Sequence, residues 1–117
     1  DGFALVTCPD LQSVAALIAS NKLLEPAYTS PAGPIAPLDI LYGLRSALAA
    51  GNHFMAHRCG FTRDVLIQVF QQSGFAQCAA RQRPPHFDLW ALATKQEWPN
   101  DQLQAAAAQY IPGWGTP

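Results

Sequence analysis

The chain has 117 residues, half of them apolar, which is enough for one domain with a modest hydrophobic core. Its formal net charge is −1, and it carries only seven Lys and Arg residues. Because phosphate backbones are bound mainly by clustered Lys and Arg, this charge argues against a nucleic-acid partner. No apolar run approaches the roughly 20 residues that a transmembrane helix requires, so no membrane span is predicted.

Cysteine usage indicates a reducing compartment. The three cysteines, Cys8, Cys59 and Cys78, are odd in number and stand at unrelated spacings. Such a pattern fits reduced thiols better than a disulfide framework. We therefore expect a cytoplasmic protein with free thiols.

The first predicted element is a strand at residues 3–8. Phe3-Ala-Leu-Val-Thr-Cys8 is a nearly continuous apolar run, which is typical of strands buried on both faces in parallel sheets. Asp10 follows as a potential N-cap, and the apolar residues after it recur at helical spacing until about Asn21. A strand followed by a helix indicates an α/β fold.

Residues 22–57 are predicted to be an insertion after this first strand and helix. Four prolines and a glycine between Pro26 and Pro37 leave too little room for regular structure, so an ordered loop or lid is expected there. Pro37 can then occupy the first turn of a helix whose apolar pattern continues to Leu48 and ends at Gly51-Asn52.

The next segment, residues 60–95, predicts a helix, a strand, a tight break and a second strand. Thr62 is a suitable N-cap, and Gly74 stands where a left-handed residue would end the helix. The expected buried face of this helix comprises Val65, Leu66, Val69 and Phe70. Strand patterns follow at residues 75–81 and 87–94, separated by two prolines. In the tail, residues 96–117, a helix with Asn100 as its N-cap is expected, and Pro112 would end it.

Taken in order, these segments resemble the C-terminal half of class I S-adenosylmethionine-dependent methyltransferases. The motifs that carry the resemblance are Thr7-Cys8-Pro9-Asp10, Gly60-Phe61-Thr62, Ser73-Gly74-Phe75 and the run from Phe87 to Ala93. In that family a helix with a Gly-Phe ending precedes the sixth strand, and an antiparallel seventh strand lies between the fifth and the sixth. The resemblance covers residues 1–95, and the segments at 31–34, 38–43 and 51–57 look like a bacterial subgroup with no obvious substrate.

The resemblance implies an α/β fold that is the C-terminal half of a Rossmann-like methyltransferase domain. We expect a three-stranded mixed sheet with residues 87–94 in the middle, antiparallel to both neighbours, and an exposed edge at residues 3–8 that favours self-association. The implied cofactor is S-adenosylmethionine. Its Gly-rich loop and its acidic ribose-binding residue are both absent from these 117 residues. The chain is therefore expected to be part of a longer enzyme and inactive by itself.

Four residues are candidates for the methyl-acceptor site, and no catalytic or cofactor-binding residue is assigned. Asp10 is a helix cap, but it also follows a strand directly, where ligands lie in open α/β sheets. His53 and His57 are four residues apart, yet no carboxylate stands at a supporting spacing, so no metal site is predicted. One histidine is expected to bind a backbone group and the other to border the substrate. Tyr42 is either a packing residue or part of a lid over the acceptor.

Two functions of different class stay open at this point. The first is the acceptor-side half of a methyltransferase that acts on an unknown acceptor, in which residues 22–57 select that acceptor. The second is a non-catalytic protein-interaction module that uses the open edge of its sheet. A strand, a Gly-rich loop and a helix encoded upstream of Asp1 would favour the first function.

Overall fold

The computed structural model describes residues 2–116, which form two compact units. One unit is built from the residues up to Asp10 together with those from Phe61 onward, and we call it the sheet unit. The other comprises Leu11–Gly60, and we call it the helical unit. The chain thus leaves the sheet unit after its first strand and returns to it fifty residues later.

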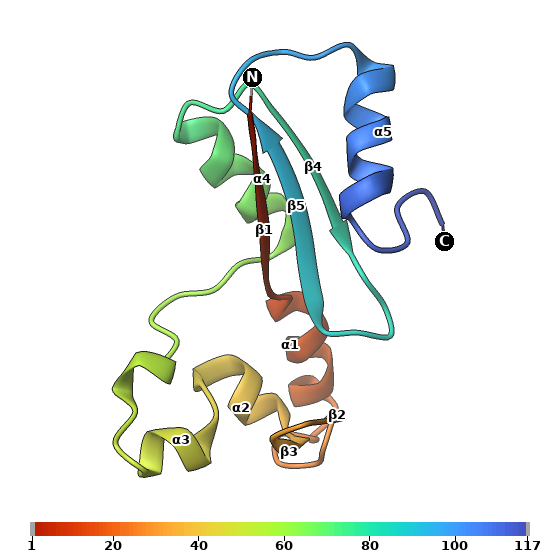
Figure 1. Cartoon of the computed structure of the whole chain (residues 1–117). Coiled ribbons are helices and arrows are strands. Elements are labelled where there is room, and N and C mark those ends of the chain that lie inside the picture. Colours follow the sequence, from red (N-terminus) through yellow and green to blue (C-terminus); the bar gives the residue numbers. More distant parts are fainter. Residues whose placement is uncertain (1, 117) are drawn as a thin grey trace. The chain divides into compact units, whose positions relative to one another are not determined.

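The sheet unit contains a three-stranded antiparallel sheet (Figure 1). Its strands are β1 (Phe3–Pro9), β4 (Gln77–Gln82) and β5 (Asp88–Thr94), in the order β1-β5-β4. Phe3 and Gln77 both pair with Thr94, at the end of β5. The central, antiparallel position predicted for residues 87–94 is confirmed. The expected mixed sheet is corrected, because β5 separates the two strands that run parallel to each other and every adjacent pair is antiparallel.

One helix packs on each face of this sheet (Figure 1). The helix α4 (Arg63–Gln72) buries Leu66 against Ala80, Leu89 and Ala91. The helix α5 (Asn100–Tyr110) covers the other face, and its N-cap is Pro99 rather than the predicted Asn100. The cluster under α5 comprises Ala79, Leu92, Leu103, Ala107 and Ile111. Successive residues of β4 and β5 point to opposite faces, so the two short apolar patterns supply two separate clusters.

The strand β1 is less covered than its apolar sequence predicts. Its residues alternate along the strand between exposed and half-buried positions, and Leu5 is 42% exposed. The cluster under α5 draws its sheet residues from β4 and β5, so it leaves this face of β1 open. The expectation that residues 3–8 are buried on both faces is therefore wrong for the described chain.

The ends of α4 follow the sequence prediction. The Thr62 hydroxyl accepts a hydrogen bond from the Val65 amide at 3.4 Å, and Gly74 adopts a φ of 88° directly after the helix. The face of α4 that the sequence predicts to be buried is only partly buried. Leu66 is 4% exposed, whereas Val65 and Val69 are 42% and 39% exposed, because the helix presents a narrower stripe to the sheet.

The helical unit has more regular structure than its prolines suggest. It contains α1 (Leu11–Ala19), a hairpin of β2 (Tyr28–Ser30) and β3 (Gly33–Ile35), α2 (Pro37–Tyr42), α3 (Arg45–Ala49) and the single 3₁₀ turn η1 (His53–Met55). The hairpin corrects the expected irregular loop. The one long helix predicted from Pro37 is instead two helices, because Gly43 adopts a φ of 111° and ends α2. Among residues 2–116 no helix combines the length and apolarity needed to cross a bilayer.

Candidate functional site

Asp10 lies at the end of β1, where the sheet unit gathers polar groups. Its side chain is fully buried, and its Oδ2 accepts a hydrogen bond from Gln82 Nε2 at 3.0 Å. The Asp10 amide donates to the Phe87 carbonyl at 3.0 Å, and its backbone forms an isolated parallel bridge with Phe61. Residues from β1, β4 and two loops thus fix one buried carboxylate at this end of the sheet.

The neighbours of Asp10 are poorly suited to nucleophilic catalysis. Burial raises the pKa of the Cys8 thiol, and the negative charges of Asp10 and Asp88 raise it further. A thiol with a raised pKa stays protonated at neutral pH and is a poor nucleophile. Burial also acts to raise the pKa of Asp88, but hydrogen bonds and charge from Arg83 outweigh it and lower that pKa. Arg83 donates to both oxygens of Asp88, at 3.0 and 2.6 Å, so this pair is neutralised internally.

The other three predicted residues lie in the helical unit. The His57 amide donates to the Tyr42 carbonyl at 3.0 Å, and His57 Nδ1 lies 2.8 Å from the Ile40 carbonyl oxygen. Because a carbonyl only accepts, Nδ1 is the donor in this hydrogen bond. The expectation that one histidine binds a backbone group is confirmed for His57. Tyr42 and His57 are therefore brought together through the backbone.

His53 does not share a helix face with His57. The turn η1 begins at His53 and ends at Met55, so the two rings are not presented by one helix. Among residues 2–116 no group of three or more His, Cys, Asp or Glu side chains is placed to hold a metal ion. Next to His53, Phe54 is fully exposed and Met55 is 40% exposed. This part of the helical unit presents apolar side chains to solvent.

Asp39 organises the core of the helical unit. Its carboxylate is buried and accepts hydrogen bonds from the Ala36 amide, the Arg45 amide and two nitrogens of the Arg45 guanidinium. The guanidinium hydrogen bonds hold the pKa of Asp39 well below its ordinary value. No local sequence pattern indicates this ion pair, because Asp39 and Arg45 are six residues apart and do not share a helix face.

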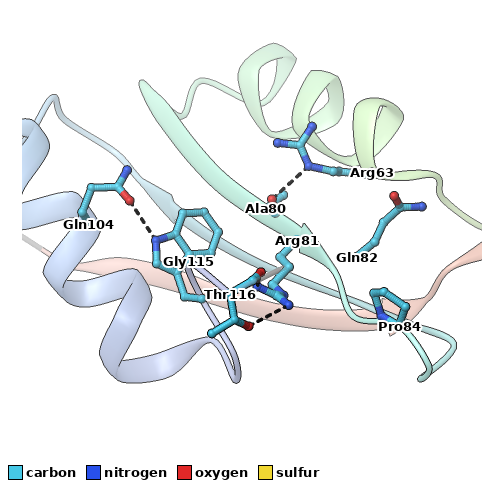
Figure 2. Close-up of a pocket in the computed structure, with 9 residues that line it drawn as sticks. Arg63, Ala80, Arg81, Gln82, Pro84, Gln104, Gly115 and Thr116 are labelled. Carbon is cyan, nitrogen blue, oxygen red and sulfur yellow. Dashed lines mark hydrogen bonds between the residues drawn. The ribbon is translucent and has the colours of Figure 1, made fainter.

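A pocket of about 440 Å³ lies beside β4 in the sheet unit (Figure 2). Its walls come from the start of α4, the strand β4, the helix α5 and the segment after it. The lining residues are Arg63, Ala80, Arg81, Gln82, Pro84, Gln104, Trp114, Gly115 and Thr116. None of them is a predicted site residue. They come from segments about fifty residues apart, so no local sequence pattern predicts the pocket.

Hydrogen bonds fix three side chains in the walls of this pocket (Figure 2). Arg63 Nε donates to the Ala80 carbonyl at 3.0 Å, and Trp114 Nε1 donates to Gln104 Oε1 at 2.8 Å. Arg81 donates to the carbonyls of Gly113 and Thr116 and to the Thr116 hydroxyl. The pocket therefore has defined walls and carries two guanidinium groups.

Comparison with known proteins finds no family model, no curated protein and no solved structure that matches the chain. The resemblance to methyltransferases therefore stays a prediction from the sequence motifs.

Proposed function

We propose that the chain is the acceptor-side half of an S-adenosylmethionine-dependent methyltransferase. The observation that carries the proposal is the strand order β1-β5-β4 with β5 antiparallel to both neighbours. The resemblance implies this arrangement for the fifth, seventh and sixth strands of the family. The helix α4, with Thr62 as its N-cap and the left-handed Gly74 after its C-terminus, precedes β4. The resemblance implies such a helix before the sixth strand.

The proposed reaction moves a methyl group from the sulfonium of S-adenosylmethionine to a nucleophilic atom of the acceptor. The carbon–sulfur bond breaks as the new bond forms, and the sulfonium leaves as the neutral thioether of S-adenosylhomocysteine. Catalysis of this kind depends mainly on holding the acceptor atom in line with the methyl group. In this proposal each unit by itself offers candidate contacts to the acceptor, Asp10 in the sheet unit and Tyr42, His53 and His57 in the helical unit. The cofactor itself is held mainly by a Gly-rich loop and an acidic residue that these 117 residues lack.

Calorimetric titration with S-adenosylhomocysteine tests the proposal. The protein translated from the whole open reading frame is expected to bind it, and the 117-residue chain is expected to give no heat. The full-length protein should also transfer a labelled methyl group from S-adenosylmethionine to a component of a cell extract. Absence of binding by the full-length protein would remove the enzymatic function.

A second function is favoured by the open edge of the sheet. The strand β1 lies at the edge of the sheet in residues 2–116, and it carries the exposed side chain of Leu5. An exposed apolar edge strand is a template for pairing with another chain. If the full-length protein does not bind S-adenosylhomocysteine but loses a partner protein when β1 is altered, the chain is an interaction module.

A further inference from the structure

We infer that the pocket beside β4 binds a small molecule in which an oxyanion group is joined to a flat apolar ring. This inference does not depend on the proposed methyltransferase function, because it rests on other residues. It follows from the charge of the pocket, from the state of its two arginines and from its aromatic wall.

The lining of the pocket is positively charged. Arg63 and Arg81 both line it, and none of the nine lining residues is acidic. Arg63 forms an ion pair with Asp64, whose Oδ1 lies 3.3 Å from Nη1, and the Asp64 side chain is 85% exposed. A solvated carboxylate of this kind neutralises a guanidinium only weakly. The two cations therefore favour an anionic ligand.

The hydrogen-bond partners of Arg81 strengthen this conclusion. Among residues 2–116 the groups to which it donates, two backbone carbonyls and a hydroxyl, are uncharged. Its Nε is buried and has no acceptor among the described residues. Arg45 and Arg83 differ, because each is paired with an aspartate through two hydrogen bonds. Arg81 therefore has no carboxylate partner among residues 2–116, and its charge adds to the positive potential of the pocket.

Trp114 supplies the surface for the ring. Its indole N–H is bound by Gln104, so the ring is held in one orientation, and Pro84 adds a second apolar contact surface. Aromatic rings stack on such surfaces, and the neighbouring cations favour an electron-rich ring. A volume of about 440 Å³ falls within the range of small-molecule sites, roughly 300–1,000 Å³. A ligand with one ring and one oxyanion matches both parts of the lining.

Nuclear magnetic resonance titration of the whole chain tests the inference. The probes are phenyl phosphate and benzoate, which offer the two kinds of oxyanion, with benzyl alcohol and inorganic phosphate as probes that carry only the ring or only the charge. The Trp114 indole N–H resonance is assigned with Trp114→Phe. We expect phenyl phosphate or benzoate to shift this resonance at a lower concentration than either single-feature probe, and the stronger of the two identifies the oxyanion.

Substitution of the arginines provides the second readout. Arg63→Gln keeps a donor for the Ala80 carbonyl but removes the charge, and we expect it to weaken binding about tenfold or more. Arg58→Gln, at an exposed position outside the pocket, removes the same charge from the chain and should leave binding unchanged. Arg81→Gln should abolish binding, but it also releases Thr116, so Arg63→Gln is the decisive variant.

Three results would overturn the inference. The first is that no probe shifts the Trp114 resonance, and the second is that inorganic phosphate binds as tightly as phenyl phosphate. The third is an equal loss of affinity in Arg63→Gln and Arg58→Gln, which would indicate only a general charge effect. S-adenosylhomocysteine is absent from these titrations, so their outcome is independent of the methyltransferase proposal.

Discussion

At the scale of single residues, the two aspartates that are buried among residues 2–116 are stabilised in different ways. Asp39 is paired with a guanidinium, which stabilises its charged form and lowers its pKa. Asp10 receives a hydrogen bond from the neutral amide of Gln82. Each carboxylate is therefore held within its own unit, Asp39 by a cation and Asp10 by a neutral donor.

We expect Asp39→Asn to lower the free energy of unfolding by about 1.5–3 kcal/mol, because charge-assisted hydrogen bonds are lost. The pKa of Asp39 is lower in the folded chain than the unfolded value of about 3.9, so the stabilisation is present above that pH and disappears as the pH falls through the folded pKa. Urea unfolding followed by circular dichroism at neutral pH, and again as the pH is lowered below about 3.9, measures both effects.

Asp64→Asn is the matched control for this substitution. It removes the carboxylate from another Asp–Arg pair, but the side chain is 85% exposed, so we expect little change in stability. Equal unfolding curves for Asp39→Asn and the unsubstituted chain at neutral pH would contradict the assignment. A difference between them that persists unchanged in acid would contradict its electrostatic origin.

At the scale of elements, the break between α2 and α3 depends on Gly43. Its φ of 111° lies in the region that favours glycine, and its amide donates to the Asp39 carbonyl at 2.9 Å. A Cβ built on Gly43 would overlap the Met55 carbonyl. The backbone of η1 therefore approaches the end of α2 closely, and a side chain at this position has no room.

Gly43→Ala and Gly51→Ala separate the cost of a side chain at positive φ from the cost of the steric overlap with Met55. Both glycines have a positive φ, but a Cβ on Gly51 meets nothing within 4 Å. We expect Gly51→Ala to cost about 1–2 kcal/mol for the backbone alone. Gly43→Ala should cost a further 1–3 kcal/mol, roughly, for the steric overlap. Thermal unfolding measures both, and equal shifts of the melting temperature would show that the close approach to Met55 does not exist.

The elements that the sequence predicts are those with strong local signals. The capped helix α4 and the strands β4 and β5 have periodic apolar residues and clear boundaries. The sequence does not predict the division of the helix from Pro37 into α2 and α3. Gly43 interrupts an otherwise helical pattern, and a single glycine is tolerated within a helix. The pocket was missed for another reason. Arg63, Arg81 and Trp114 are distant in the sequence, and only the tertiary structure brings them to one place.

At the scale of the whole molecule, the two edges of the sheet differ. On β4, Arg63 binds the Ala80 carbonyl and thereby occupies part of the strand's outer edge. On β1, Phe3 packs against Trp98 and Tyr110, but Leu5 remains 42% exposed. Charged side chains and covering segments are the usual protection of an edge strand. The described chain has that protection on β4 and lacks it along most of β1.

We therefore expect the 117-residue chain to self-associate through β1, with a mass that rises with concentration in size-exclusion chromatography with light scattering. Leu5→Lys should shift it toward the monomer, because a lysine on an edge strand opposes pairing. Val65→Lys is the matched control, since Val65 on α4 is also 42% exposed but lies outside the sheet. It should associate like the unsubstituted chain. A monomer at every concentration, or equal effects of the two lysines, would show that the edge of β1 does not drive association.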